Sequence, residues 1–491
     1  MRILLASSEV HPYSKTGGLA DATGALGKAL AKAGYRVGIV TPLYRGIREK
    51  FPALRKVDWH FDFLLGDKYA GGEVWTLEPL KGLTIYFIHK PEYFDRPGIY
   101  IEAGSDYWDN GERFIYFSKC VVHLARYLPW RPDVVHASDW QTGLIPLMVR
   151  HQSRAERWAN PPRTCFTIHN LAYQGYFPAS TYALAKASPE YFHGEGAEHF
   201  GALNCLKAGI AFADVVTTVS PRYAREITTQ EFGEGLDGLL RKRQGQGSLV
   251  GILNGVDYEE WNTTKNPHLK FPYSAADLSG KARCKAALQR ELGLPVEPRT
   301  PLFGTVTRLA EQKGIDIQLG ALEEMLNAGI QFALLGSGST EYELAFQNLA
   351  RRFPTRAGVT IGYHHGLAHR LEAGCDFYLM PSRFEPCGLN QMYSLRYGTI
   401  PVVRRTGGLD DSVLDAIDDS NAANGIKFSE YSAPALARAI RKALVIYSSP
   451  GLVEVYRRNG MNVDFSWERV VGAFLECYET GSKAGHAASE L

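Results

Sequence analysis

The chain begins with an apolar run, Ile3-Leu4-Leu5-Ala6, which leads into the segment Lys15-Thr16-Gly17-Gly18-Leu19-Ala20-Asp21. A similar segment, Arg405-Thr406-Gly407-Gly408-Leu409-Asp410-Asp411, follows a second apolar run, Ile400-Pro401-Val402-Val403. Each copy contains a cation, a hydroxyl, a glycine pair and a carboxylate. Glycines after a strand let backbone N–H groups approach an anion closely. The pattern favours two α/β halves that offer loops to one shared ligand; the alternative is two ordinary strand-to-helix turns that look alike by chance.

The two segments are not equivalent parts of a repeat. The early copy follows the first predicted strand of its half, whereas the late copy follows about the fifth strand of the other half. Lys15 is therefore the stronger candidate for direct ligand contact, and Arg405 is the weaker one.

Length and composition restrict the possible classes of protein. A chain of 491 residues is too long for a single core and suggests two or three domains. Its net charge of +2, from 54 basic and 52 acidic residues, argues against a nucleic-acid partner. The seven cysteines contain no Cys-x-x-Cys pair, which is typical of a reduced, cytoplasmic protein. All apolar runs are shorter than a membrane span, so no membrane partner is expected.

Short apolar runs alternate with segments of helical period, which predicts parallel sheets with crossover helices. The first half has predicted strands at 2–7, 36–40, 133–136, 164–168 and 214–219, and helices at 20–33, 111–127 and 199–212. The second half has predicted strands at 302–307, 330–335, 358–361, 376–380 and 400–403, and helices at 313–327 and 388–397. Residues 57–89 alternate and predict an antiparallel addition. The predicted fold class is α/β, with two doubly wound domains in series.

The domain boundaries follow from a change in pattern. Residues 254–300 are rich in proline and lack a clean period, which is typical of an interdomain passage. We predict a first domain at 1–250 and a second at 251–464. A terminal amphipathic helix is expected at 465–480, and a frayed tail at 481–491.

The segment Pro381-Ser382-Arg383-Phe384-Glu385-Pro386-Cys387-Gly388-Leu389 lies between a predicted strand and a helix expected to begin near Gly388. A helix start there directs unpaired N–H groups at whatever lies above the strand. Because Glu385 repels a phosphate, its natural partner is a neutral hydroxylated group such as a sugar. The alternative is a glutamate that only balances the helix dipole.

Arg308 and Lys313 follow the predicted strand 302–307, where two cations can neutralise a departing diphosphate. The alternative is a solvated surface. The chain has no P-loop motif and no Asp-x-Asp pair, so fixed cations and helix starts would act in place of a metal.

Asp139 and His169 follow two other predicted strands, at the edge where ligands bind. Either can also be an ordinary polar group with satisfied hydrogen bonds. Tyr363, after the strand 358–361, is expected either to cover an adenine ring or to pack in the core.

With these motifs together, the chain resembles bacterial glycogen synthases and the related starch synthases. The matching segments are 15–21, 167–175, 206–209, 253–257, 308–314 and 381–389, and they extend over nearly the whole chain. The resemblance implies the GT-B architecture, two Rossmann-like domains that face a central cleft, with the C-terminal helix packed back on the first domain. It also implies transfer of glucose from ADP-glucose to the non-reducing end of an α-1,4-glucan, such as glycogen or a malto-oligosaccharide, with retention of configuration and with neither cofactor nor metal.

The resemblance also implies a role for each matching residue. Lys15 and Gly18 would contact the phosphates or sugar of the donor, and Arg308 and Lys313 would hold its diphosphate. Glu385 would bind glucose hydroxyls, and the backbone of Cys387, Gly388 and Leu389 would meet sugar or phosphate. His169 and Asp139 would line the reacting face. The flanking donor-site positions are Asp21, Asn254, Gln312, Tyr363, Thr406 and Gly408.

The chain departs from the family pattern at a few positions. Ser138 and Gln141 stand where many relatives have histidine, and Asn390 stands where threonine is common. Tyr393 lies eight positions after Glu385, where the wider superfamily often has a second glutamate, so a mechanism with paired carboxylates is not expected. Two alternatives stay open: a nucleotide-sugar epimerase on the same fold, and a glucan-binding relative without catalysis. No residue of the sequence distinguishes an adenine from a uracil base, so the choice of ADP-glucose over UDP-glucose rests on the resemblance.

Overall fold

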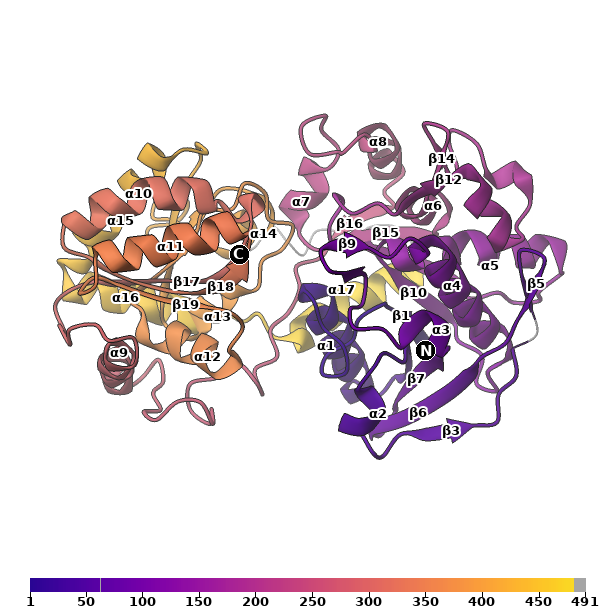
Figure 1. The fold of residues 1–491 in the computed structure, drawn as a ribbon, viewed down its shortest axis with the longest axis horizontal. Coiled ribbons are helices and arrows are strands. Elements are labelled where there is room, and N and C mark those ends of the chain that lie inside the picture. Colours follow the sequence, from indigo (N-terminus) through magenta and orange to yellow (C-terminus); the bar gives the residue numbers. More distant parts are fainter. Residues whose placement is uncertain (62, 481–491) are drawn as a thin grey trace. The chain divides into compact units, whose positions relative to one another are not determined.

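The computed structural model describes residues 1–61 and 63–480, and it divides the chain into two compact units. Unit 1 contains Met1–Gly255 and the chain from Trp467, and unit 2 contains Val256–Ser466 (Figure 1). These boundaries lie a few residues beyond the predicted ones, because Gly255 packs against unit 1: a Cβ there would lie 2.8 Å from Cγ of Trp467. Asn254 therefore belongs to unit 1. The predicted tail, 481–491, lies outside the described residues.

Unit 1 is built on one large sheet. Its strands, in spatial order, are β16 (Leu249–Gly251), β15 (Val215–Thr218), β11 (Arg163–Ile168), β10 (Val134–Ser138), β1 (Arg2–Ala6), β2 (Arg36–Pro42), β7 (Leu83–His89), β6 (Glu73–Leu80) and β3 (Arg55–Val57). The strands from β16 to β7 are parallel, and β6 and β3 continue the sheet antiparallel. Smaller sheets are formed by β12 (Tyr176–Pro178), β14 (Ala202–Asn204) and β13 (Glu198–His199), by β4 (Phe63–Leu65) and β5 (Lys68–Ala70), and by β8 (Ile101–Glu102) and β9 (Ser105–Asp106).

The predicted antiparallel addition at 57–89 is only partly correct. Strand β7 pairs in parallel with β2, with Val37 opposite Leu83, so it belongs to the main sheet. The chain reaches it through the tight turn at Gly82, which has a φ of +90°. Only β6 runs opposite to the other strands of this sheet, because β3 is antiparallel to β6 and so has the same direction as β7.

The strand order of unit 1 reverses next to β1. The chain passes from β1 to β2 on one side and later returns to β10 on the other side. The loops that leave the carboxyl ends of β1 and β10 therefore diverge and leave a crevice, which is where ligands bind in open α/β sheets.

Unit 2 is built on a fully parallel sheet with the same kind of reversal. Its strands, in spatial order, are β19 (Ala357–Ile361), β18 (Gln331–Gly338), β17 (Leu302–Leu309), β20 (Phe377–Met380), β21 (Ile400–Arg404) and β22 (Ile426–Phe428). Its reversal lies between β17 and β20. Phe303 and Phe377 stack across this pair with ring centroids 4.9 Å apart, in the main apolar core.

Helices cover both faces of each sheet, which confirms the predicted fold class. In unit 1 they are α1 (Gly18–Lys32), α2 (Ile47–Lys50), α3 (Pro91–Phe94), α4 (Asn110–Tyr127), α5 (Leu144–Ala155), α6 (Cys205–Phe212), α7 (Pro221–Glu226), α8 (Asp237–Gly245) and α17 (Trp467–Thr480). In unit 2 they are α9 (Ser279–Glu291), α10 (Ile315–Asn327), α11 (Thr340–Arg352), α12 (His365–Gly374), α13 (Asn390–Arg396), α14 (Gly407–Ser412), α15 (Ala433–Tyr447) and α16 (Pro450–Asn462). Figure 1 shows α10, α11 and α15 on one face of the unit 2 sheet and α9 and α12 on the other.

Two helices differ from the sequence prediction. Helix α6 begins at Cys205 rather than at 199, because residues 198–204 form the hairpin of β13 and β14. Asn204 then caps the helix by accepting a hydrogen bond from the N–H of Lys207. Helix α9 lies inside the predicted interdomain passage. It buries Lys281 and Lys285 on its inner face, and these charges interrupt the apolar period that would have revealed it.

Helix α17 packs on unit 1. The hydroxyl of Tyr478 lies 2.8 Å from Nδ1 of His136 on β10, and Arg163 of β11 donates to the carbonyl of Glu479 at 2.7 Å. Within residues 1–61 and 63–480, no helix is long and apolar enough to cross a membrane. All seven cysteines lie in the described part of the chain, where they are buried and form no disulfide.

Candidate active site

Lys313 and Glu385 meet at the strand reversal of unit 2. Nζ of Lys313 lies 2.6 Å from Oε2 of Glu385, and the hydroxyl of Ser382 donates to the same oxygen at 3.0 Å. The side chain of Glu385 is only 8% exposed, and that of Lys313 is 17% exposed. The geometry brings together the cation predicted after β17 and the carboxylate predicted after β20.

The two loops that carry this pair are held in register by their backbones. The N–H of Arg383 donates to the carbonyl of Gln312 at 2.8 Å, and Nε2 of Gln312 donates to the carbonyl of Phe384 at 3.4 Å. Gly314, with a φ of +70°, lets the first loop touch the second, because a Cβ there would lie 2.1 Å from the carbonyl oxygen of Pro381. Gln312 therefore acts on the site partly by shaping it.

The glycine pair of the late segment packs directly against the Glu385 loop. The N–H of Gly408 donates to the carbonyl of Glu385 at 3.1 Å. A Cβ on Gly407 would lie 2.0 Å from that carbonyl oxygen, and a Cβ on Gly408 would lie 2.0 Å from the carbonyl oxygen of Cys387. Thr406, next to this pair, is 1% exposed. Close approach of two backbones therefore explains these glycines.

Gly408→Ala is expected to destabilise the protein by about 1–3 kcal/mol, because the new methyl group forces the Glu385 loop away. The matched control is Gly451→Ala in α16, where a Cβ meets no atom within 4 Å. Thermal unfolding of both variants checks the prediction. A melting temperature of Gly408→Ala equal to that of the natural protein would show that the Glu385 loop can move to accept the methyl group, and would contradict the prediction.

The helix after the Glu385 loop begins later than predicted. Gly388 has a φ of +70°, Leu389 occupies the cap position and α13 begins at Asn390. Cys387, Gly388 and Leu389 therefore lie in the loop that precedes the helix. Asn390, which departs from the family pattern, donates to the hydroxyl of Tyr378 at 2.8 Å, and so it has a structural contact of its own.

The remaining candidates of unit 2 are exposed at the same edge of the sheet. Arg308 lies within β17, because this strand continues two residues beyond its predicted end at 307, and Arg308 is exposed. Tyr363 follows β19 and is 79% exposed, so the core-packing alternative is wrong. Its ring faces solvent, as a ligand-covering role requires.

The Lys15 loop of unit 1 is built on a buried carboxylate, that of Glu9. This residue is 3% exposed, and it accepts hydrogen bonds from the backbone N–H and hydroxyl of Thr16, from the N–H of Gly17 and from the hydroxyl of Tyr100. Glu9 was not among the residues predicted from the sequence. The signal for it is the polar run Ser7-Ser8-Glu9 directly after an apolar strand.

Above this anchor, Lys15 pairs with Asp21 inside its own segment. Nζ of Lys15 lies 2.8 Å from Oδ1 of Asp21, and α1 begins at Gly18 between them. The pair leads directly from the β1 loop into the first turn of the helix.

Arg405 has the same kind of contact as Lys15, but in a larger network. Its guanidinium lies 3.2 Å from Asp410 and 2.9 Å from Asp418, and the buried Lys427 contacts the same two carboxylates. These ion pairs hold Arg405 within its own loop, and it stays the weaker candidate for contact with a ligand.

Asp139 and His169 lie at the strand reversal of unit 1. Oδ1 of Asp139 accepts a hydrogen bond from the backbone N–H of His169 at 2.7 Å. Asp139 has a φ of 58° and a ψ of −178°, a conformation that is nearly restricted to glycine. The surrounding protein raises the pKa of Asp139 to about 7 and lowers the pKa of His169 to about 4, in each case mainly by burial of the charged form.

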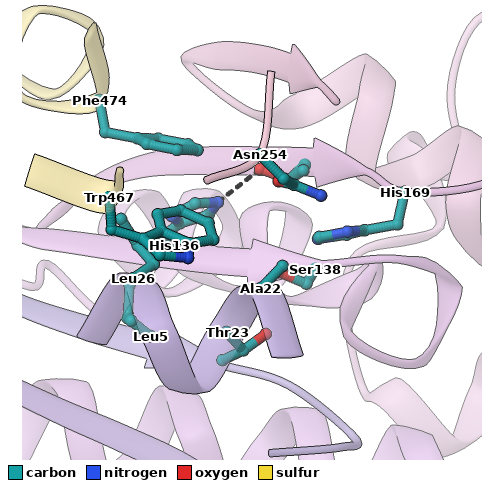
Figure 2. Close-up of a pocket in the computed structure, with 11 residues that line it drawn as sticks. Leu5, Ala22, Thr23, Leu26, His136, Ser138, His169, Asn254, Trp467 and Phe474 are labelled. Atoms are coloured by element: carbon teal, nitrogen blue, oxygen red, sulfur yellow. Dashed lines mark hydrogen bonds between the residues drawn. The ribbon is translucent and has the colours of Figure 1, made fainter. Parts of the chain in front are cut away.

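A pocket in unit 1 opens beside these groups (Figure 2). Its polar lining includes Ser138, His169 and Asn254, and its apolar walls come from α1 and α17. Among the described residues, the buried hydroxyl of Thr23 finds no hydrogen-bond partner, so it can serve a ligand in this pocket. Asn254 thus joins His169 in one site, although the predicted boundary assigned it to the other domain.

His136 closes the floor of the pocket as a neutral imidazole. Its Nε2 lies 2.5 Å from the hydroxyl of Thr167, and burial lowers its pKa to about 3 (Figure 2). The native state therefore binds fewer protons at His136 than the unfolded chain does between about pH 3 and 6.5, and so the stability falls as the pH falls through this range.

His136→Gln is expected to lose about 2 kcal/mol less stability than the natural protein when the pH falls from 7 to 5. Urea unfolding at the two pH values measures this. The control is His60→Gln, because the side chain of His60 is 90% exposed. An equal loss in His136→Gln and the natural protein would contradict the assignment.

Two family models match the chain. The starch synthase catalytic domain matches residues 2–242, and the glycosyl transferases group 1 model matches residues 291–459. The glycogen synthase of Anaeromyxobacter dehalogenans is 48% identical over 486 residues, which cover 98% of this chain and 99% of the relative. The chain belongs to the glycogen synthase family. The glycogen synthase of Thioalkalivibrio sulfidiphilus is also 48% identical, with the same coverage.

Solved structures of related glycosyltransferases agree with the family assignment. The catalytic domain of starch synthase IV from Arabidopsis thaliana, bound to ADP and acarbose, superposes with a TM-score of 0.88 at 33% identity, covering 98% of this chain and 99% of that one. Sucrose-phosphate synthase from Thermosynechococcus elongatus has a TM-score of 0.61 at 18% identity and shares the fold. This chain is therefore a glycosyltransferase with the GT-B fold, as its resemblance to glycogen synthases predicts.

Proposed function

We propose that this chain transfers glucose from ADP-glucose to the non-reducing end of an α-1,4-glucan with retention of configuration. The observation that carries the proposal is the contact between Lys313 and Glu385 at the strand reversal of unit 2. A cation suits the diphosphate of a donor, and a carboxylate beside it suits the hydroxyls of the glucose.

In the proposed reaction, an acceptor hydroxyl oxygen bonds to the anomeric carbon of glucose. The bond from that carbon to the diphosphate breaks, and the departing ADP takes the proton of the acceptor. Charge accumulates on the leaving group, so Arg308 and Lys313 are assigned to it. Fixed cations give this stabilisation without a metal, since their charges need no rearrangement during the reaction.

Unit 1 contributes the other assigned residues. His169 places the sugar, Asp139 positions His169, and Lys15 and Gly18 contact the donor. Asp21 and Asn254 are assigned to flanking donor-site positions in unit 1. The corresponding flanking positions in unit 2 are Gln312, Tyr363, Thr406 and Gly408. The backbone of Cys387, Gly388 and Leu389 is assigned to contact sugar or phosphate. Seven buried cysteines without a disulfide among the described residues support a cytoplasmic location.

A transfer assay tests the proposal. Purified protein is incubated with ADP-glucose or UDP-glucose, with and without glycogen, and both nucleotide release and glucan growth are measured. We expect nucleotide release from ADP-glucose that depends on glycogen, and an α-linked product by NMR. Consumption of the nucleotide sugar without glycogen would favour the epimerase alternative, and glycogen binding without transfer would favour the non-catalytic one.

A further inference from the structure

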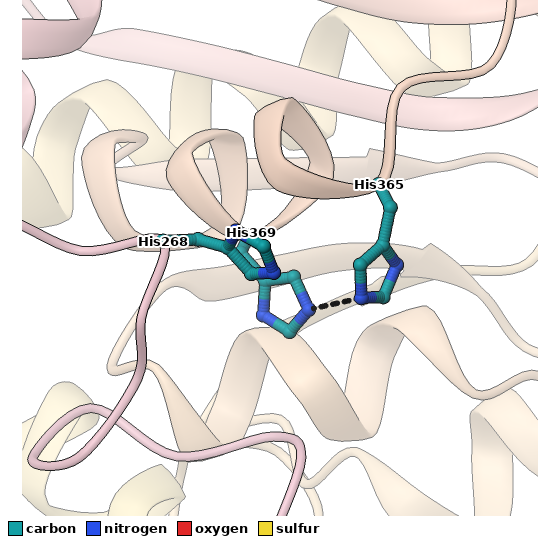
Figure 3. A group of neighbouring side chains, drawn as sticks. All are labelled: His268, His365 and His369. Atoms are coloured by element: carbon teal, nitrogen blue, oxygen red, sulfur yellow. Dashed lines mark hydrogen bonds between the residues drawn. The ribbon is translucent and has the colours of Figure 1, made fainter.

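Three histidines from two distant segments of unit 2 converge at the start of α12, and none of them is assigned to the proposed active site. The rings of His268, His365 and His369 turn toward one another (Figure 3), and one ring nitrogen from each lies within 4.8 Å of the others. His365 and His369 stand one turn apart at the start of α12, and His268 comes from the loop after Val256. We propose that these three side chains bind one zinc ion.

The spacing of two nitrogens already matches a zinc site. Nε2 of His365 and Nε2 of His369 lie 3.2 Å apart. Zn–N bonds of about 2.0–2.1 Å at a tetrahedral angle place two ligand nitrogens about 3.3 Å apart. The i,i+4 spacing on α12 puts both rings on one face of the helix, so they can bind the same ion. The third nitrogen, from His268, needs only a small movement of a loop side chain.

The outer side of His369 has the partner that a metal-bound histidine needs. Its Nδ1 lies 2.8 Å from the hydroxyl of Tyr397, which can accept a hydrogen bond from Nδ1–H while Nε2 binds the ion. Asn266 supports both sides of the cluster: its Nδ2 donates to the Tyr397 hydroxyl at 2.8 Å, and its Oδ1 accepts from the N–H of His268 at 2.9 Å. Such partners fix the tautomer and the orientation of the ring.

Aromatic packing fixes the plane of the buried ring. Trp261 stacks on His369 with centroids 4.1 Å apart, and on its other face it stacks on Tyr393 at 3.7 Å. Tyr393, the position where the wider superfamily often has a second glutamate, therefore has a packing role here. The stack leaves His369 little freedom to turn away from the other two histidines.

The open side of the cluster provides a route for the ion and a place for a fourth ligand. The side chain of His365 is 40% exposed, so an ion can enter from solvent. Oε1 of Glu260 lies 3.6 Å from Nε2 of His365, and its negative charge favours a divalent cation. Imidazole-rich sites with one carboxylate or water suit zinc. Such an ion would tie the loop after Val256 to α12.

Isothermal titration of the full chain with zinc chloride, on protein purified without a polyhistidine tag, tests the proposal. We expect one equivalent to bind to the natural protein and to the control His60→Ala. His365→Ala and His268→Ala should bind at least about 100-fold more weakly, and Tyr397→Phe about 10–100-fold more weakly. The absence of saturable binding to the natural protein, or equal binding by His365→Ala, would overturn the proposal.

A second measurement separates loss of the site from loss of the fold. Zinc should raise the melting temperature of the natural protein and of His60→Ala, because a ligand that binds only the native state stabilises it. His365→Ala should melt normally without zinc and show no increase with zinc. A zinc-dependent increase of equal size in His365→Ala would also overturn the proposal.

Discussion

Lys313→Ala is expected to lower the turnover number for glucose transfer by about 10²–10³-fold. A preorganised charge that faces a developing oxyanion contributes about 3 kcal/mol to the transition state, which corresponds to this factor. Steady-state assays with ADP-glucose and glycogen measure it. A turnover number within about tenfold of the natural value would refute the assignment of Lys313 to the leaving group.

The contact between Lys313 and Glu385 makes a second variant necessary. Removal of Lys313 leaves a carboxylate that is 8% exposed without its cation, and breaking a buried pair costs about 3–5 kcal/mol. The double variant Lys313→Ala/Glu385→Gln removes both charges, so we expect it to recover stability and to stay inactive. Arg438→Ala is the control for a lost surface pair, because Arg438 and Glu430 are both exposed and 3.3 Å apart.

Most of the fold could be predicted because apolar runs mark buried parallel strands regardless of their partners. The wrong predictions concern elements whose structure depends on neighbours that are distant in the sequence. The direction of β7 depends on which edge of the sheet is available, and no local pattern records this. Helix α9 was missed because Lys281 and Lys285 point inward, where carbonyl oxygens and Asp376 accept hydrogen bonds from their ammonium groups.

The candidate site was predicted by residue type and place, but its internal contacts were not. Glycine pairs suggested loops that approach a ligand, whereas Gly407 and Gly408 have little space beside the Glu385 loop. Glu9 was missed because a carboxylate that holds backbone N–H groups looks like any other glutamate in a sequence. Lys15 and Glu385 could be proposed from the sequence because each lies in the loop that follows a buried strand, at the edge of the sheet where ligands bind.

The conformation of Asp139 is the strongest structural sign that unit 1 takes part in the reaction. A φ of 58° with an extended ψ costs of order 1–3 kcal/mol for a residue other than glycine. Burial also raises its pKa to about 7, so its native form binds more protons than the unfolded chain between about pH 4 and 7. Asp139 therefore lowers stability as the pH rises through this range. Asp139 thus lowers the stability of the protein both through its backbone conformation and through its raised pKa. Because it also holds the backbone of His169, we infer that its role is to position His169.

Asp139→Ala is therefore expected to lower the turnover number by about 10²-fold, because His169 loses the acceptor that fixes its backbone and small misplacements near the reacting atoms are costly. Asp139→Asn keeps an acceptor oxygen without the charge, so it should retain most of the activity at pH 7. In both variants the decrease of stability between pH 4 and 7 should become smaller, which urea unfolding measures. A structural role alone would change the unfolding curves and leave the turnover number of Asp139→Ala close to the natural value, and that outcome would remove Asp139 from the site.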